Sequence, residues 1–250
     1  MAWPDPRTTQ NTGMGMGRTS VGTTAQSDVA YDEGLRTYML KVYNYMASGV
    51  LLTGIVAMLF ASSGMAADIM LGGGPLKWVI MLSPLAIVFA MSFGQNKFST
   101  MTLQAMFWGF ATLMGLSLST IFLVYTGTSI AQTFFATAAA FMGLSLYGYT
   151  TKKDLSGWGS FLIMGVIGLI VAMVINIFLQ SSIFSMAISG IGVLIFAGLT
   201  AYDTQRIKSM YAYVAGTDMV GKVVIMSALN LYLDFINMFQ FLLYFMGNQE

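Results

Sequence analysis

The sequence predicts an all-α membrane protein that crosses the bilayer seven times. Of its 250 residues, 56% are hydrophobic and only 8% are charged, whereas an ordinary soluble domain has about 25% charged residues. A soluble domain of this size could not cover its surface with so few charges, so we expect most of that surface to face lipid. Long apolar runs, separated by short polar breaks, give the number of crossings.

The chain begins with a polar segment, residues 1–27, which is typical of a disordered cytoplasmic tail. It contains no apolar run of signal-peptide length, so we do not expect a cleaved secretory signal. Residues 28–45 mix charged side chains with Tyr31, Leu35 and Tyr38, a spacing that predicts a short amphipathic helix at the membrane surface. The transmembrane domain is therefore expected over residues 28–250, with this interfacial helix leading into its first span.

Each apolar run is about 20 residues long, which is enough for a helix to cross the hydrocarbon core. Two of the polar breaks, Thr126–Ser129 and Gln180–Ser182, are so short that each must join two antiparallel helices. The longest break, Thr204–Lys222, separates the last two spans. The predicted spans are Tyr45–Ser62, Trp78–Gly94, Leu103–Tyr125, Ile130–Tyr149, Trp158–Leu179, Ile183–Tyr202 and Val223–Met246.

The basic residues sort to one side of this topology, which supports an odd number of spans. Cytoplasmic segments of membrane proteins carry an excess of Lys and Arg. Only Lys77 falls on the opposite side, so we expect a cytoplasmic N-terminus and an outward-facing C-terminal tail, Gly247–Glu250. The basic residues on the predicted cytoplasmic side are Arg7, Arg18, Arg36, Lys41, Lys97, Lys152, Lys153, Arg206, Lys208 and Lys222.

The absence of two residue types excludes whole classes of chemistry. The sequence has no Cys and no His, so thiolate and imidazole metal sites, Ser-His and Cys-His nucleophiles and disulfides are excluded. The net charge of +1 gives no reason to expect a nucleic-acid partner. We therefore expect no enzymatic activity and no cofactor, and the lipid bilayer as the surrounding partner.

Two of the ten acidic residues are exceptions to the sorting of charge, because one lies at the cytoplasmic end of a predicted span and the other lies within one. Asp203 follows the end of span six, and Asp234 lies near the middle of span seven. An acidic side chain at a helix centre costs about 2.5–3.5 kcal/mol on membrane-insertion scales. Such a residue persists only where it faces protein or water, so it marks a functional site by default.

Span seven carries further polar side chains on the same helical face as Asp234. Ser227, Asn230 and Asn237 follow the spacing of three or four residues that aligns side chains along a helix. This stripe suits a cation path or a buried hydrogen-bond network, and in span six Thr200 lies one turn before the acidic residue. For the Asn and Ser residues the alternative is a purely structural role in joining helices.

If Asp203 and Asp234 meet, their carboxyl groups would share a proton and titrate as a unit. They would also offer oxygen ligands to a hard cation such as Ca²⁺, which makes them the candidate metal ligands. Their depths differ, because Asp234 lies about 18 Å along its helix from Lys222, whereas Asp203 is about one turn from Arg206. They meet only if span six continues helically past Asp203 or if a water-filled vestibule opens from the cytoplasm, and we expect both.

Four segments resemble the Bax inhibitor family in its bacterial branch, and the resemblance covers residues 30–250. It implies a bundle of seven helices with the last helix central, located in the bacterial inner membrane, and a pH-sensitive calcium leak. A pair of aspartates on helices six and seven is the pH sensor and gate in that family, and the matching positions are Asp203 and Asp234. The four segments are Met114–Ile130, Ser145–Ser156, Phe196–Lys208 and Ala228–Phe239.

The resemblance also implies a basic residue near the pair, from the cytoplasmic end of helix two. In this sequence Lys97 is the candidate for that latch. An Arg is often found there, and because Lys makes no bidentate fork to a carboxylate, a latch through Lys97 would be weaker. The acid that some relatives carry within helix two is absent from Trp78–Gly94.

Two alternative functions remain open. Other bacterial relatives regulate an ATP-dependent membrane protease, so a regulatory protein without transport activity, with a membrane-bound protease as its partner, is the first alternative. The second is an intramembrane aspartyl protease, which also uses one Asp on each of two neighbouring helices. This class needs a Gly-rich turn before its second Asp, where the present sequence has Leu231–Leu233, and a Pro-containing motif that is absent after Pro84.

Overall fold

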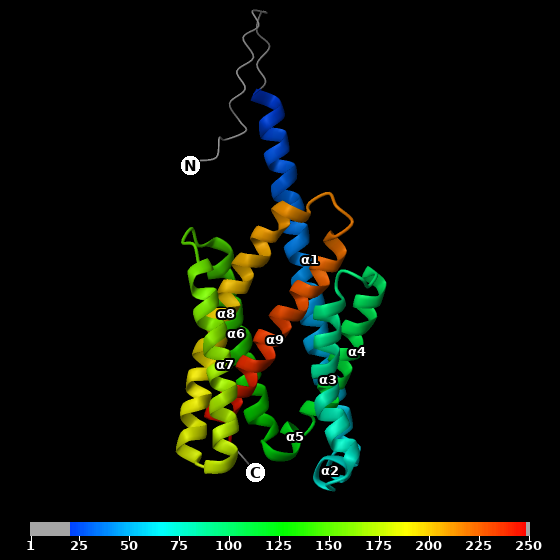
Figure 1. Cartoon of the computed structure of the whole chain (residues 1–250), viewed down its shortest axis with the longest axis vertical. Helices are drawn as coiled ribbons and strands as arrows, with labels where there is room; N and C mark the ends of the chain where they lie inside the picture. The colour runs from blue at the N-terminus through cyan, green and yellow to red at the C-terminus, as the bar shows by residue number, and fades with distance from the viewer. Residues whose placement is uncertain (1–20, 249–250) are drawn as a thin grey trace, which may run out of the picture.

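The structure, a computed structural model, describes residues 21–248, in which every regular element is a helix (Figure 1). Seven of the described helical segments are long and apolar enough to cross a membrane, so the predicted number of spans is confirmed. The third of these segments combines α4 with the short α5. The helices are α1 Val21–Ser62, α2 Met65–Leu71, α3 Pro75–Gly94, α4 Thr100–Leu118, α5 Ile121–Val124, α6 Gly127–Thr150, α7 Ser156–Leu179, α8 Ser182–Val214 and α9 Val220–Met246.

Hydroxyl side chains in the polar breaks cap the helices that follow them. Ser99 accepts a hydrogen bond from the backbone N–H of Thr102 at the start of α4. Thr126 caps α6 and Ser181 caps α8 in the same way. A cap of this kind satisfies a backbone donor that has no partner within its own helix. The short breaks are therefore true helix boundaries, as their composition predicts.

Helix α8 is longer than the predicted sixth span, which ended at Tyr202. It continues through residues that were expected to form a loop and ends at Val214. The extension is stabilised by packing, because Ile207 is buried and the ring of Tyr211 lies 5.2 Å and 5.3 Å, between centroids, from Tyr31 and Tyr38 of α1. The predicted continuation past Asp203 is thus present.

The same packing explains why α1 differs from the expected interfacial helix. Residues 28–45 are not a separate element but the N-terminal part of α1, which begins at Val21, before the expected end of the tail at residue 27. Leu35 and Tyr38 are buried, so this part of α1 is held against the extended end of α8. Of the tail predicted over residues 1–27, residues 1–20 lie outside the part of the chain that the structure describes.

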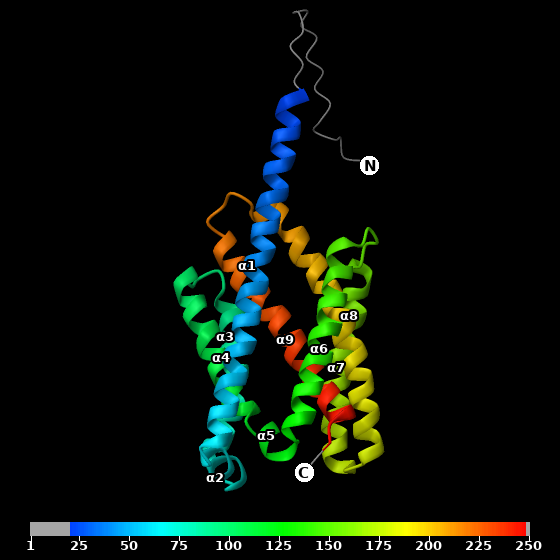
Figure 2. The same cartoon turned by 180° about the vertical axis from the view of Figure 1, so that it is seen from behind.

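Helix α9 runs obliquely between two groups of helices, with α1, α3 and α4 on one side and α6, α7 and α8 on the other (Figures 1 and 2). It packs directly against α1, α4, α6 and α8, while α3 packs on α4 and α7 packs on α8. Large side chains of α9, including Leu229, Tyr232 and Met238, are fully buried. The expectation of a central last helix is confirmed, with α3 and α7 forming an outer layer.

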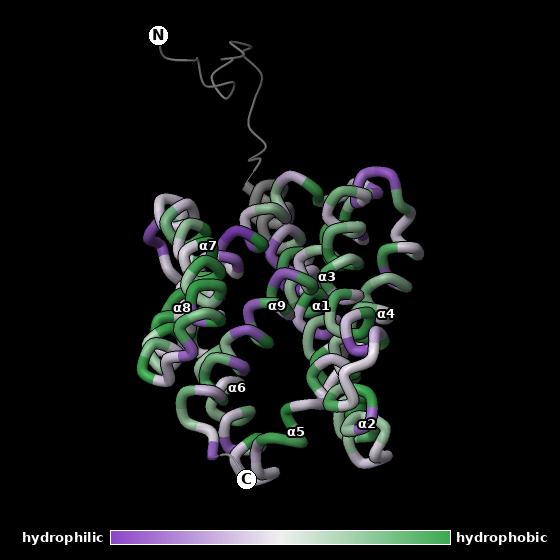
Figure 3. The backbone as a smooth tube through the Cα atoms, turned by 60° about the horizontal axis from the view of Figure 1, so that its bottom comes forward, coloured by the Kyte–Doolittle hydropathy of each residue, from purple (hydrophilic) through white to green (hydrophobic). Residues whose placement is uncertain are grey.

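The outer surface of the described bundle is apolar, as a lipid-facing surface must be. Figure 3 shows hydrophobic residues along much of the outer helices, and Phe178, Leu194 and Phe93 are among the large exposed side chains. The turns that follow α3, α6 and α8 lie at one end with the N-terminal part of α1, whereas α2, α5 and the turn after α7 lie at the other (Figure 1). The basic residues of these segments therefore gather at one end, and Lys77 lies at the opposite end.

Helices α6 and α8 approach one another closely at Gly148. A Cβ atom at this position would collide with the backbone carbonyl oxygen of Ala201 on α8. At Gly143, on the same helix, no atom lies within 4 Å of the corresponding point. Gly148 is therefore needed for close packing beside Asp203, whereas Gly143 is not.

We expect Gly148→Ala to lower the free energy of unfolding by about 1–3 kcal/mol, because the added methyl group forces two backbones apart. Gly143→Ala is the matched control, and it should leave stability unchanged or raise it by up to about 1 kcal/mol through helix propensity. Titration of the purified protein with sodium dodecyl sulfate, followed by circular dichroism, measures both. Equal effects of the two substitutions would contradict the close approach.

The absence of native cysteines makes the predicted orientation directly testable, since single cysteines can be introduced without background labelling. Asn96 and Ser63 are exposed at opposite ends of the bundle, in the turns after α3 and α1. In intact cells an impermeant maleimide should label Ser63→Cys but not Asn96→Cys, and disrupted membranes should allow both to react. The reverse pattern would show that the N-terminal end faces outward.

Candidate functional site

A chamber of about 390 Å³ lies between α7, α8 and α9. Most of its wall is apolar, with Leu169 and Met173 from α7 and Phe196 and Leu199 from α8 among the lining residues. The polar side chains in the wall come from the stripe on α9 and from one residue of α8. They are Asp203, Asn230, Asp234 and Asn237.

The two carboxyl groups meet in this chamber. The carboxyl groups of Asp203 on α8 and Asp234 on α9 lie within hydrogen-bonding reach of each other, and only 4% of the surface of Asp234 is exposed. The Oδ2 atom of Asp234 is buried and has no hydrogen-bond partner among the described residues. A hydrogen bond between two carboxyl groups requires one proton, because an ionised carboxylate can only accept. The geometry thus fits a pair that holds one proton between two helices.

Helix packing above and below the pair sets its position. On α8, Gly192 has no side chain, and the ring of Phe241 from α9 occupies the space where a Cβ atom would lie. Phe241 also stacks on Phe196, with 5.8 Å between ring centroids. Together with the close approach of α6 at Ala201, these contacts hold α8 beside α9 over the length of the chamber.

The amide side chains extend the set of oxygen atoms around the carboxyl pair. The Nδ2 group of Asn237 donates to the backbone carbonyl of Leu233 over 2.7 Å, so its amide oxygen remains available to the chamber. Asn230 lines the same wall one turn before Asp234. Ca²⁺ takes about six to eight oxygen ligands, and the described residues hold no cluster of three or more acidic residues. Water would therefore supply much of the coordination, which suits weak binding.

Two predicted members of the polar network point away from the chamber. Ser227 is buried beside the hydroxyl group of Tyr38 from α1. Thr200 is fully buried, and its hydroxyl donates to the carbonyl of Phe196 on its own helix over 2.8 Å. Helical spacing places Ser227 and Thr200 on the same helix faces as the acidic residues. However, α8 and α9 each contact several other helices, so polar side chains on one face are divided between different interfaces.

The structure does not bring the candidate latch to the pair. Lys97 is exposed in the turn after α3, and α3 packs on α4 and α2 rather than on the helices that carry the carboxyl groups. The cation that acts on Asp203 is Arg206, three residues further along α8. The spacing of three residues between Asp203 and Arg206 on one helix indicated this proximity in the sequence.

A chain of hydroxyl groups that sequence reasoning missed crosses the bundle next to Asp203. Tyr43 of α1 donates to Ser145 of α6 over 2.7 Å, and Ser145 donates to Thr204 of α8 over 2.8 Å. Thr204 in turn donates to the backbone carbonyl of Thr200 over 2.8 Å, which sets the direction of the whole chain. Three helices are thereby joined at the level of the residue that follows Asp203.

Comparison with known proteins places the chain among bacterial membrane proteins. The model of the family described as "Inhibitor of apoptosis-promoting Bax1" matches residues 35–250. The chain is 50% identical to an uncharacterized protein of Rickettsia prowazekii over 229 residues, which cover 91% of this chain and 96% of the relative. It is 43% identical to the inner membrane protein YbhL of Escherichia coli over 219 residues, or 87% of this chain and 94% of the relative.

A membrane protein of Streptococcus pyogenes is 37% identical over 227 residues, which cover 90% of this chain and 96% of the relative. Together with the seven apolar helices, these relatives identify a multi-pass protein of the bacterial inner membrane. The relatives each cover most of the chain, and the residues matched by the family model include the helices that carry both aspartates. The chain therefore belongs to the Bax inhibitor family.

Proposed function

We propose that this protein is a pH-sensitive calcium leak of the inner membrane, in which Asp203 and Asp234 form the sensor and the gate. The observation that carries the proposal is the meeting of two carboxyl groups, from different membrane-spanning helices, in a chamber lined by amide groups. Burying a pair of carboxyl groups within a membrane protein costs free energy. Such a pair therefore marks a functional site by default.

Protons and Ca²⁺ compete for the same oxygen atoms in this arrangement. A carboxyl group must lose its proton before it binds a metal ion. With its proton, the pair links α8 to α9 through the hydrogen bond between Asp203 and Asp234. Without it, two like charges face each other at close range and attract a divalent cation. The pH of the chamber therefore controls both the contact between the helices and the affinity for the cation.

The composition of the chamber favours passage of the ion over retention. Conduction requires a site that attracts the ion yet releases it, and two carboxyl groups with two amides supply fewer ligands than Ca²⁺ takes in a closed site. A volume of about 390 Å³ leaves room for several water molecules, each of which occupies about 30 Å³. A partly hydrated ion thus fits beside the pair.

We expect Asp234→Asn to lower calcium flux by about tenfold, which corresponds to the loss of about 1.4 kcal/mol of cation attraction, and to remove its dependence on pH. The amide keeps the size of the side chain and can still bond to Asp203, so the fold should persist. Calcium uptake into proteoliposomes, recorded over about pH 5 to 8, measures both quantities. Asp218→Asn, which neutralises an exposed acid between α8 and α9, is the matched control and should leave both unchanged.

A double-mutant cycle tests whether the two carboxyl groups act as one unit. Asp203→Asn should remove the pH dependence as completely as Asp234→Asn does, and the double variant should add little to either, because coupled groups are not additive. The same flux assay gives the three values. Additive losses would show that the groups act separately, and a double variant that keeps its pH response would show that the sensor lies elsewhere. A wild-type protein without calcium flux would contradict the leak itself.

A further inference from the structure

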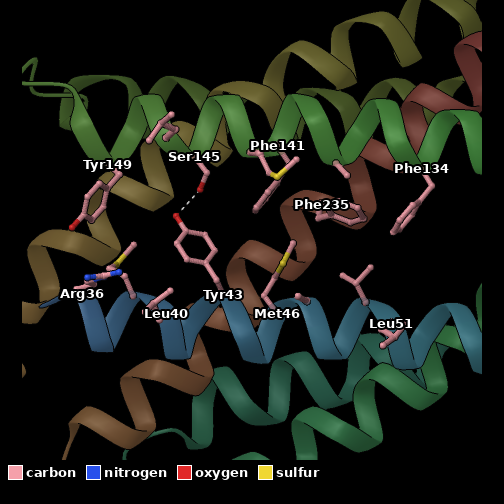
Figure 4. A pocket seen from close by; sticks show the side chains of 16 residues that line it. Arg36, Leu40, Tyr43, Met46, Leu51, Phe134, Phe141, Ser145, Tyr149 and Phe235 are labelled. Atoms are coloured by element: carbon pink, nitrogen blue, oxygen red, sulfur yellow. Dashed lines mark hydrogen bonds between the residues drawn. The ribbon is translucent and has the colours of Figure 1, made fainter. Parts of the chain in front are cut away.

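A larger cavity, of about 900 Å³, lies between α1 and α6, away from the carboxyl chamber (Figure 4). Its wall is almost entirely apolar, with Met46, Phe141 and Phe235 at its centre. Among the described residues, Arg36 is the only charged side chain in its wall, and it lies with Tyr149 at one end. We call this cavity the α1–α6 groove.

The groove is open towards the bilayer. Leu40 of α1 and Met142 and Leu146 of α6 line it, and each has more than half of its surface exposed (51%, 66% and 62%). The hydrogen bond of Tyr43 to Ser145 joins the two helices that form the groove, and the hydroxyl of Ser145 also bonds to the buried Thr204. Because both helices are membrane spans, the hydrocarbon of the bilayer has direct access to the opening.

The length of the groove matches the thickness of one leaflet of the bilayer, headgroups included. Its lining on α1 runs from Arg36 to Leu51, which corresponds to about 22 Å at 1.5 Å per residue. One leaflet is about 20–22 Å thick when its headgroups are included, and about 15 Å of this is hydrocarbon. A lipid chain that enters beside Leu51 would thus place its headgroup near Arg36.

The end of the groove at Arg36 is positively charged. Lys208 of α8 adds a second cation there, since its Nζ atom lies 4.7 Å from the centre of the Tyr149 ring and donates to the carbonyl of Tyr149 over 2.8 Å. Asp32 and Glu33 lie on the preceding turn of α1 but do not line the groove. Basic pockets between membrane helices bind anionic lipid headgroups, and Tyr side chains are enriched at that depth.

We propose that the α1–α6 groove is a binding site for an anionic phospholipid, with its phosphate at Arg36 and Lys208 and an acyl chain along the apolar wall. Charge complementarity selects an anionic over a zwitterionic lipid, and the apolar wall selects a lipid over a soluble anion. The site is independent of the calcium leak, because it uses neither Asp203 nor Asp234.

Native mass spectrometry of the purified full chain tests the selectivity for charge, with phosphatidylglycerol and phosphatidylcholine of identical acyl chains as probes. The wild-type protein should retain phosphatidylglycerol preferentially. Arg36→Gln should lower that preference about fivefold, the factor that one basic residue near a membrane surface supplies, and Arg36→Lys should retain it. Lys41→Gln is the matched control, because Lys41 is an exposed basic residue of α1 that does not line the groove. Equal retention of both lipids by the wild type, or equal effects of Arg36→Gln and Lys41→Gln, would overturn the proposal.

A second pair of variants tests the location of the acyl chain. Ala47 lines the groove, whereas Ala140 is exposed on α6 outside it. Ala47→Trp should fill the groove and reduce retention of phosphatidylglycerol, and Ala140→Trp should leave retention unchanged. The same spectra report oligomeric state, so a dimer without lipid that Ala47→Trp dissociates would show that a second copy occupies the groove, and the proposal would be wrong.

Discussion

A carboxyl group at the middle of a membrane-spanning helix must be kept away from lipid, and most of this fold can be understood from that requirement. Asp234 lies halfway along α9, and α9 is accordingly the most enclosed of the spans. Its oxygen atoms need a polar partner, which Asp203 supplies because α8 continues beyond the expected end of its span. Tyr31 and Tyr38 of α1 then pack on Tyr211 in that extension of α8 and hold the two helices together.

Two groups of helices pack on either side of α9. Hydrogen bonds from hydroxyl groups connect α9 to the group that contains α1 and α4. Tyr232 of α9 donates to Thr53 of α1 over 2.7 Å, and Thr53 donates to the carbonyl of Ala111 on α4 over 2.8 Å. Asp234 and Phe235 are neighbours in sequence, yet they line different cavities. Helix α9 therefore separates the polar chamber from the apolar groove.

Local sequence patterns predicted the helix ends and the two acidic residues well, but they could not divide a polar stripe among its neighbours. Asn230 and Asn237 reach the chamber, whereas Ser227 turns towards α1, although all three lie on the stripe that contains Asp234. The position of Lys97 near the pair was inferred from a resemblance and not from helix packing. In the structure α3 packs on α4 and α2 instead. The electrostatic effect of Arg206 on Asp203 is local and could be predicted from their spacing, whereas the bond from Tyr43 to Ser145 joins residues far apart in the chain.

The number of spans, the short breaks between them and the presence of two carboxyl groups in an apolar environment could be predicted from sequence alone, because hydrophobicity, capping residues and the cost of buried charge act within single helices. The meeting of Asp203 with Asp234, the true length of α8 and the groove beside Arg36 were decided only in the tertiary structure. Each depends on how one helix packs against another. Close packing at Gly148 and the tyrosine contacts of α1 involve residues with large separations in sequence, so no local pattern contains them.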